Sequence, residues 1–361
     1  MNYGLIAYKY VSILKNFSFT SIPKDFKKNE NLNLKNKIIF TSNEDTINLY
    51  KIDPDGKNKE KIINSFVPYY EIFFTPNLDK IVFEKNNTIE SNKDIYVINN
   101  DGSSSINLIE NNLDSFDPDI SPNGKEIVFS SKKEEQKLIN TDIYKVNIDG
   151  TALKKLTEYP LSEEKAKWSP DNKKILFLSG DRDSFEKSDL NKIKDNLYDL
   201  PRQIYLMDSD GDNEIKLTNS SYSIKNAIWS RNGKYILFIS VPELYVMNND
   251  GTNQIQLTNL KSPIYDPDWS PDNEKIVFQA GEDLYIIKRD GTNLIKLADH
   301  EVTTGKNENT FYFHPLWSPD GTKIIFTSSR WGGTYYDIYT INSDGTDPKH
   351  ITNGELVNWK N

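Results

Sequence analysis

The hydrophobic positions of this chain recur in a fixed order. A three-residue apolar run that ends in Phe, such as IVF ending at Phe83, is followed by a segment like DIYVINNDG, which starts at Asp94. An apolar run without polar positions predicts a strand that is covered on both faces. The run and the Tyr-centred segment occur together seven times, with the tyrosines at Tyr50, Tyr96, Tyr144, Tyr205, Tyr245, Tyr285 and Tyr339.

Turn motifs connect these segments into hairpins. Most apolar runs follow a motif such as WSPDNKK from Trp168 or WSPDGTK from Trp317. Pro fixes φ and Asn or Gly takes the left-handed position, so the strand that carries Trp must double back into the apolar run. The Asp-Gly turn after each Tyr-centred segment predicts a second hairpin, in which Gly supplies the positive φ. One repeat therefore predicts four short antiparallel strands.

Repeats of this kind predict the fold. Four-stranded units of about 40 to 50 residues, each with an aromatic residue, are typical of propeller blades. We expect an all-β, seven-bladed β-propeller of four-stranded antiparallel blades. The first apolar run, ending at Phe40, has no turn motif before it, whereas Trp359 near the C-terminus occupies a Trp position. The first blade is therefore expected to be closed by both termini, which leaves no exposed sheet edge. Six blades plus an N-terminal hairpin is the alternative.

The sequence divides into two parts. Residues 37–361 hold the repeats, and residues 1–36 form an N-terminal segment and linker. The fourth repeat carries a charged insert at 181–200, in which we expect a short helix around residues 190–198. Arginines in the loops of these repeats, such as Arg182, are expected to tie neighbouring blades together.

Composition narrows the function classes. The chain has 44 Lys and Arg against 53 Asp and Glu, a net charge of -9, so a nucleic acid partner is not expected. Its lack of cysteine excludes thiolate metal sites and a cysteine nucleophile. No apolar stretch approaches the ~18 residues of a transmembrane segment, and the N-terminus has no clear secretory signal.

The last repeat carries a family resemblance. WSPDGTKIIFTSSRWGGTYYDIYTINSDGTDPKHIT, at 317–352, resembles the TolB-like β-propeller family, and the similarity extends over residues 37–359. The resemblance implies a protein-binding platform outside the cytoplasm, in the periplasm or cell envelope, while the missing signal leaves the cytoplasm open. The 36 residues before the first blade are too few for the α/β domain that precedes the propeller in TolB. The chain has no G-x-S-x-G elbow either, so a peptidase domain is not expected.

Candidate site residues come from the innermost strands, which line the axis of a propeller. The residue three positions before each Trp or its equivalent is expected near one mouth of the channel, and six of these seven residues are polar. Polar groups that converge on a concave mouth are typical of binding sites, although strand ends near water are polar for structural reasons as well. The candidates are Glu71, Asp117, Lys165, Asn226, Asp266 and His314, and the seventh position is Leu356.

These observations favour a non-catalytic, monomeric platform that binds a protein or peptide, with no cofactor and no metal. No nucleophile, base and orienting group stand together in the sequence. The alternative is a carbohydrate- or metal-handling enzyme with its site at the channel mouth, similar to oligogalacturonate lyases. Those enzymes hold a divalent metal on His and Gln, whereas only His314 of the three histidines falls at a channel position. A sensor or accessory domain for a separate catalytic or membrane chain is the third hypothesis.

Overall fold

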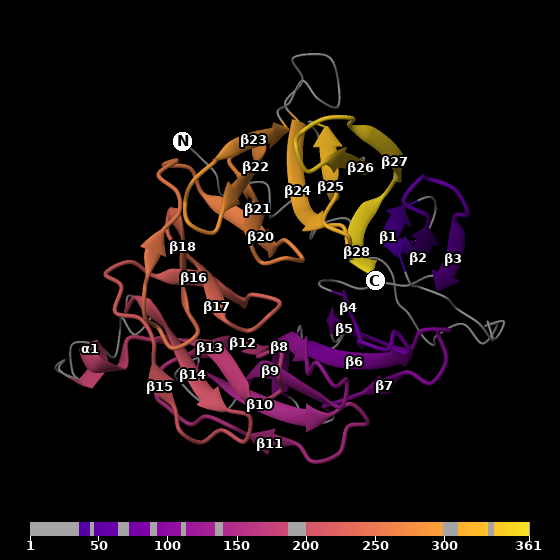
Figure 1. Cartoon of the computed structure of the whole chain (residues 1–361). Helices are drawn as coiled ribbons and strands as arrows, with labels where there is room; N and C mark the ends of the chain where they lie inside the picture. The colour runs from indigo at the N-terminus through magenta and orange to yellow at the C-terminus, as the bar shows by residue number, and fades with distance from the viewer. Residues whose placement is uncertain are drawn as a thin grey trace.

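Seven four-stranded antiparallel sheets surround a central axis, each as one blade of a propeller (Figure 1). The seven-bladed, all-β prediction is confirmed, and the alternative of six blades is wrong. The structure is a computed structural model that describes residues 36–43, 47–63, 72–86, 92–109, 113–133, 140–186, 200–298, 310–330 and 336–360.

Each blade is ordered from the axis to the rim, and the blades are numbered from the one that holds β1. The innermost strands of blades 1 to 7 are β28 (Glu355–Lys360), β4 (Ile72–Phe74), β8 (Leu113–Ile120), β12 (Glu163–Trp168), β16 (Ile224–Trp229), β20 (Ile264–Trp269) and β24 (Thr310–Trp317). The second strands are β1 (Lys37–Asn43), β5 (Lys80–Asn86), β9 (Glu126–Lys133), β13 (Lys174–Gly180), β17 (Tyr235–Ser240), β21 (Lys275–Ala280) and β25 (Lys323–Arg330).

The outer half of each blade holds the Tyr-centred strand and a short edge strand. The third strands are β2 (Ile47–Ile52), β6 (Lys93–Asn99), β10 (Thr141–Asn147), β14 (Arg202–Asp208), β18 (Glu243–Asn248), β22 (Asp283–Lys288) and β26 (Tyr336–Asn342). The rim strands are β3 (Glu60–Ile63), β7 (Ile106–Asn107), β11 (Lys154–Lys155), β15 (Ile215–Lys216), β19 (Ile255–Gln256), β23 (Ile295–Ala298) and β27 (Lys349–Asn353).

Blade 1 is closed by both ends of the chain, as the sequence predicts. Lys37 of β1 pairs with Lys360 of β28, and β1 continues outward to β2 and β3. Gly354 lies between β27 and β28, and its N–H donates to the Tyr336 carbonyl at 2.8 Å. A Cβ there would lie 2.5 Å from the Thr41 carbonyl oxygen, at a φ of +143°. Only glycine fits this passage from blade 7 into blade 1.

The blades pack through aromatic pairs and shared apolar clusters. The Phe that ends each apolar run stacks on the Tyr of the neighbouring strand, with ring centroids 5.3 to 5.9 Å apart. Each large cluster joins adjacent blades, as where Leu237 of blade 5 packs with Trp269 and Ile276 of blade 6. The second strands are therefore covered on both faces, as their unbroken apolar pattern predicts.

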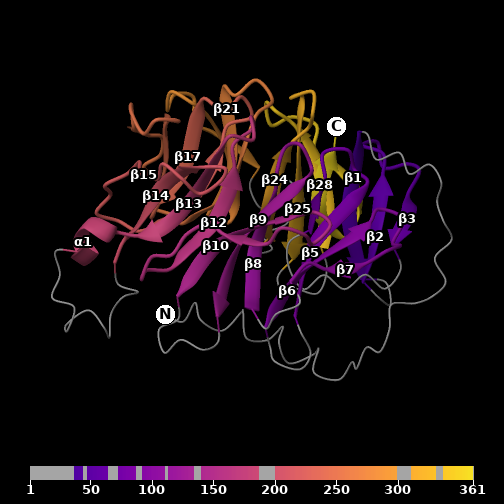
Figure 2. The same ribbon diagram turned by 90° about the horizontal axis from the view of Figure 1, so that it is seen from below.

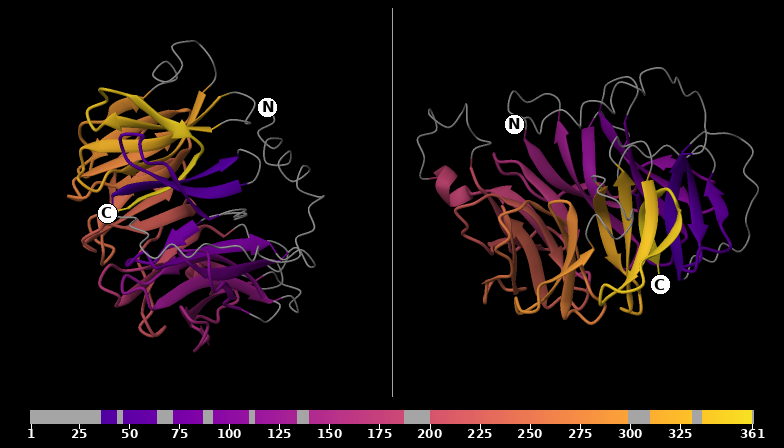
Figure 3. Two further views of the ribbon diagram at one scale, coloured as in Figure 1. Left: turned by 90° about the vertical axis from the view of Figure 1, so that its right-hand side faces the viewer. Right: turned by 90° about the horizontal axis from the view of Figure 1, so that it is seen from above.

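The strands run between the two faces of the ring, and the short helix α1 (Arg182–Glu186) lies at its outer edge beside blade 4 (Figures 2 and 3). The helix expected around residues 190–198 lies outside the described residues. No helix in the described ranges has the length and apolar character needed to cross a membrane.

Candidate functional site

The innermost strands of four blades share a break in strand pairing at which one residue is left-handed, while β16 has a pairing shift at the same level without such a residue. In β8 the pairing with β9 shifts between Phe116 and Asp119, and in β20 the pairing with β21 shifts between Tyr265 and Asp268. At each break one residue other than glycine has a left-handed backbone, which is a β-bulge with a local conformational cost. These residues are Asp117 (φ 52°), Lys165 (φ 57°), Asp266 (φ 48°) and His314 (φ 49°).

Proline accounts for three of the four breaks. Asp117, Asp266 and His314 each stand directly before Pro. Proline has no N–H to donate to the neighbouring strand, so the ladder of hydrogen bonds is interrupted where it stands. The dipeptides Asp-Pro and His-Pro inside a predicted innermost strand were thus a sequence signal for these bulges. Lys165 adopts the same backbone before a fully buried Ala166. The residues next to Lys165 in the sequence do not predict this backbone.

The bulges are held by side chains from the preceding blade. The N–H of Asp117 donates to Glu84 Oε1 at 2.6 Å, and the N–H of Lys165 donates to Ser130 Oγ at 3.2 Å. Both acceptors occupy the position directly after the Phe of the apolar run. Sequence reasoning missed Glu84, because its role depends on a contact with the next blade and no local pattern marks it.

His314 and Asp266 form a polar pair between blades 7 and 6. The backbone N–H of His314 donates to Asp266 Oδ2 at 3.3 Å, and His314 Nε2 lies 3.6 Å from the same oxygen. Their side chains are 49% and 41% exposed, so both remain accessible from the channel. A carboxylate beside an imidazole can orient the ring.

A second layer of contacts lies two residues further along these strands. The N–H of Trp168 donates to Asp119 Oδ2 at 2.8 Å, and the N–H of Trp317 donates to Asp268 Oδ2 at 2.9 Å. Lys167 Nζ lies 3.5 Å from Asp119 Oδ1 and 5.5 Å from the centre of the Phe73 ring. These contacts join blades 2, 3 and 4 and, through Trp317 and Asp268, blades 6 and 7, so they tie neighbouring innermost strands together.

Three carboxylates near the bulges have raised pKa values: Glu84, Glu164 and Asp268, the last because of its burial. Burial raises the pKa of Glu84, against the charge of Lys93, whose Nζ lies 3.1 Å from Glu84 Oε2. Burial also raises the pKa of Glu164, which forms an ion pair with Arg202, and the nearby charge of Asp117 acts in the same direction. Charge on this side of the channel is therefore densely paired.

The predicted site residues lie on the innermost strands wherever the structure describes them. Asp117, Lys165, Asp266 and His314 occupy bulges, whereas Asn226 pairs with Ile239 of β17 without a left-handed backbone. Among the predicted positions, Leu356 is buried and Glu71 lies outside the described residues. Below, "channel mouth" means Asp117, Lys165, Asn226, Asp266 and His314. No cluster of three or more His, Asp or Glu suited to a metal ion occurs in the described part of the chain.

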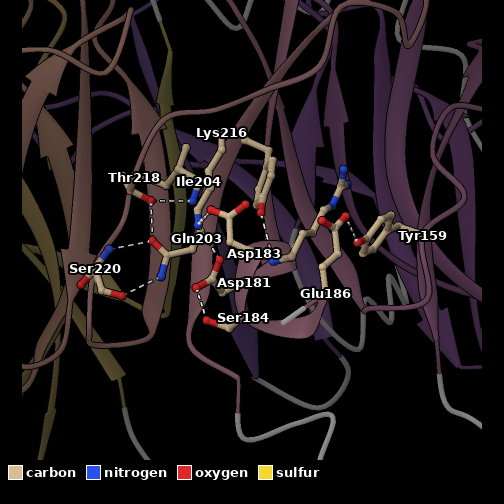
Figure 4. A network of polar contacts seen from close by, with 12 residues as sticks. Tyr159, Asp181, Asp183, Ser184, Glu186, Gln203, Ile204, Lys216, Thr218 and Ser220 are labelled. Atoms are coloured by element: carbon tan, nitrogen blue, oxygen red, sulfur yellow. Dashed lines mark hydrogen bonds and ion pairs between the residues drawn. The ribbon is translucent and has the colours of Figure 1, made fainter. Parts of the chain in front are cut away.

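A second concentration of charge lies at the outer end of blade 4. Lys216 of β15 forms ion pairs with Asp181 and with Asp183, the latter at 2.7 Å (Figure 4). In the same view, the Tyr159 hydroxyl donates to Glu186 of α1 at 3.1 Å. The helix is thus attached at both ends of its single turn.

Arg182 is the centre of this region, which we call the blade 4 network. Its guanidinium forms ion pairs with Glu163 of β12 and with Glu214 before β15. It also lies 4.3 Å from the centre of the Tyr159 ring and 4.6 Å from that of Tyr205. Both carboxylates belong to blade 4 itself, so the expectation that this arginine ties neighbouring blades together is wrong for its ion pairs. Among the described contacts of its guanidinium, Tyr159, in the connection from blade 3, extends beyond the blade.

Comparison with known proteins assigns part of these repeats to a family. Residues 190–361 match the family of the TolB beta propeller domain. Residues 190–361 carry TolB-type propeller repeats. The resemblance that rests on the turn motifs and Tyr-centred strands is thereby confirmed. No curated protein matches the sequence.

Solved structures share the fold of this chain at low sequence identity. An oligogalacturonate lyase in complex with manganese aligns with a TM-score of 0.64 at 14% identity, over 84% of this chain and 85% of that chain. A prolyl endopeptidase aligns with a TM-score of 0.64 at 9% identity, over 89% of this chain and 49% of that chain.

A third structure differs in how its ring is described. The propeller domain of the Trilobed protease from Pyrococcus furiosus aligns with a TM-score of 0.58 at 14% identity, over 90% of this chain and 94% of that chain. That domain is described as having an open velcro topology. In this chain β28 pairs with β1 and closes the first blade.

Proposed function

We propose that this TolB-type propeller is a non-catalytic platform that binds a protein or peptide partner at the channel mouth. The observation that carries the proposal is the row of left-handed residues at one level of the innermost strands. Glycine adopts such a backbone at lower cost, yet these positions hold Asp117, Lys165, Asp266 and His314. Their side chains are exposed or half-buried, so core packing does not explain them.

The partner and location follow from the resemblance. We take residues 37–361 as the binding domain and residues 1–36 as its linker, acting as a monomer. By resemblance to TolB, we place the platform in the cell envelope and its partner among envelope proteins. The fold provides a rigid ring, and the specificity lies in the side chains at the mouth.

Peptide display tests this proposal. A random peptide library is selected on the immobilised protein, and affinities of the selected peptides are measured for Asp266→Asn and His314→Asn. Asn tolerates the left-handed backbone, so both variants are expected to keep the fold. We expect at least tenfold weaker binding for both variants. Asp212→Asn, at an exposed turn away from the axis, is the control and should bind normally. Unchanged affinity in both mouth variants would contradict the proposal.

The second candidate is an enzyme that acts on a carbohydrate at the same mouth. It is favoured by the pairing of His314 with Asp266, which has the form of a base and its orienting carboxylate. The solved oligogalacturonate lyase has the same fold and is in complex with manganese. Titration with manganese and calcium, followed by an assay on uronate oligomers, tests this candidate. Saturable metal binding together with turnover that Asp266→Ala abolishes would favour the enzyme over the platform.

A further inference from the structure

Charge and aromatic surface are unevenly distributed around the channel mouth. Blades 6 and 7 present aromatic and acidic groups, while blades 4 and 5 present lysines. The aromatic and acidic side consists of Tyr265, Asp266, Phe313 and His314, and the lysine side consists of Lys165 and Lys225. Since these blades are consecutive, the two sides are adjacent.

Tyr265 has an exposed ring whose position is not explained by packing between blades. Its side chain is 51% exposed on an innermost strand, directly before the exposed Asp266. The equivalent positions in blades 4 and 5 hold the charged residues Glu164 and Lys225. An exposed tyrosine ring beside a carboxylate attracts a cation through both its face and the negative charge.

Phe313 extends this aromatic side onto blade 7. Its ring centre lies 6.3 Å from that of Phe311 and 6.4 Å from that of His314. Asp268, the other acid of β20, is already paired with Arg231 at 3.3 Å. Asp266 accepts the N–H of His314 through Oδ2 but is 41% exposed, so among the described acids of β20 it is the one accessible to a ligand.

The lysine side offers the opposite charge. Lys165 Nζ donates to the carbonyl oxygen of Lys225 at 3.1 Å, which holds the two residues next to each other. Lys225 is exposed, and no ion pair of its ammonium group occurs among the described residues. The neighbouring Glu164 is paired with Arg202. Lys165 and Lys225 also lie within electrostatic range of Glu164, and Asp117 of the preceding blade adds a further negative charge there.

We propose that the mouth binds an extended peptide segment that carries both an acidic and a basic side chain. The acidic side chain is held by Lys165 and Lys225, and the basic side chain lies over Tyr265 with Asp266 as its counter-ion. This inference rests on the proposed function of the mouth and adds the chemistry of the partner. A segment of one charge sign would meet a like charge on one of the two sides.

Synthetic peptides test this proposal. The probes are fluorescein-labelled peptides with Gly-Ser spacers that carry one Arg and one Glu, in both orders and with two to five residues between them, two Arg, or two Glu. Fluorescence anisotropy measures each affinity at low salt, where exposed charges are least screened. We expect at least one peptide with both charges to bind tenfold or more tightly than both single-sign peptides. Equal binding of a single-sign peptide, or binding of none, would overturn the proposal.

Variants assign each charge to its side. Lys225→Gln should remove the advantage given by Glu, and Asp266→Asn should remove the advantage given by Arg. Lys234→Gln and Asp212→Asn, both at exposed turns, are the matched controls and should change neither. Selected display peptides that depend on the mouth but carry one charge sign would overturn this inference and leave the platform standing. Selected peptides whose affinity is unchanged by the channel-mouth substitutions would overturn both this inference and the proposed platform.

Discussion

The charged side chains of the channel mouth and of the blade 4 network differ in burial and in pairing. In the network, Glu163 is fully buried and the Arg182 guanidinium lies between two tyrosine rings and two carboxylates. At the mouth, Asp266 and His314 are about half exposed on left-handed backbone. Charges that hold the fold together are buried and paired, whereas charges available to a ligand are exposed at strained positions. Substitutions should therefore affect stability in the network and binding at the mouth.

Removal of Arg182 is expected to have the largest effect on stability. Arg182→Ala leaves Glu163 buried without its cation and removes the cation that two tyrosine rings surround. Breaking a buried pair in this way costs about 3–5 kcal/mol. Urea unfolding measures the loss.

Arg289 provides the matched control for that experiment. It also lies over a tyrosine, 4.2 Å from the centre of the Tyr235 ring, and it pairs with the exposed Glu274. Because this pair is near the surface, Arg289→Ala should cost about 1 kcal/mol or less. If the two variants lose the same free energy of unfolding, the buried ion pairs of Arg182 stabilise the fold no more than the surface pair of Arg289.

The pH dependence of stability is the next largest effect. Burial raises the pKa of Glu163 from 4.5 to about 7, against the charge of Arg182. The folded protein therefore favours the protonated carboxyl, so this residue's contribution is greatest below pH 4.5 and falls as the pH rises to about 7. The fall is on the order of 3 kcal/mol. Glu163→Gln should match the wild type near pH 4 and exceed it in stability at pH 8. A constant difference between the two proteins across this range would contradict the assignment.

The sequence predicts the blades well because their signals are local. Turn residues such as those from Trp317, and the unbroken apolar runs, specify each hairpin without reference to the rest of the chain. Closure of blade 1 was predictable for a similar reason, since the strand missing before Phe40 could be supplied only by the Trp359 segment. Both predictions depend on counting repeats rather than on distant contacts.

The details of the site were less accessible to sequence reasoning. The channel positions followed from the distance to Trp, but the left-handed backbone of Lys165 depends on its fit against blade 3. Glu84 was missed because its N–H donor, Asp117, belongs to the next blade. The carboxylate partners of Arg182 were misassigned because sequence cannot distinguish a partner in the same blade from one in a neighbouring blade.

The contacts that hold the bulges should contribute a smaller amount. Ser130→Ala removes the acceptor for the N–H of Lys165, which costs about 1 kcal/mol. Ser209→Ala is the control, since no hydrogen bond of its side chain occurs among the described contacts, and it should be neutral. Thermal unfolding of the two variants checks the difference. An equally neutral Ser130→Ala would mean that the bulge does not need support from blade 3.

The smallest expected change in stability tests whether the left-handed backbone of Lys165 is strained. Lys165→Gly places a residue without a Cβ at a φ of 57°, which relieves the left-handed strain and offsets the greater freedom of glycine in the unfolded chain. Its stability should therefore stay within about 1 kcal/mol of the wild type, on the stabilised side, while peptide binding is lost. Lys225→Gly, at the pairing shift of β16 but without a left-handed backbone, should be destabilised by about 0.5–1 kcal/mol. If Lys165→Gly is instead the more destabilised of the two, its backbone is not strained, and the mouth loses the feature that distinguishes it from the blade 4 network.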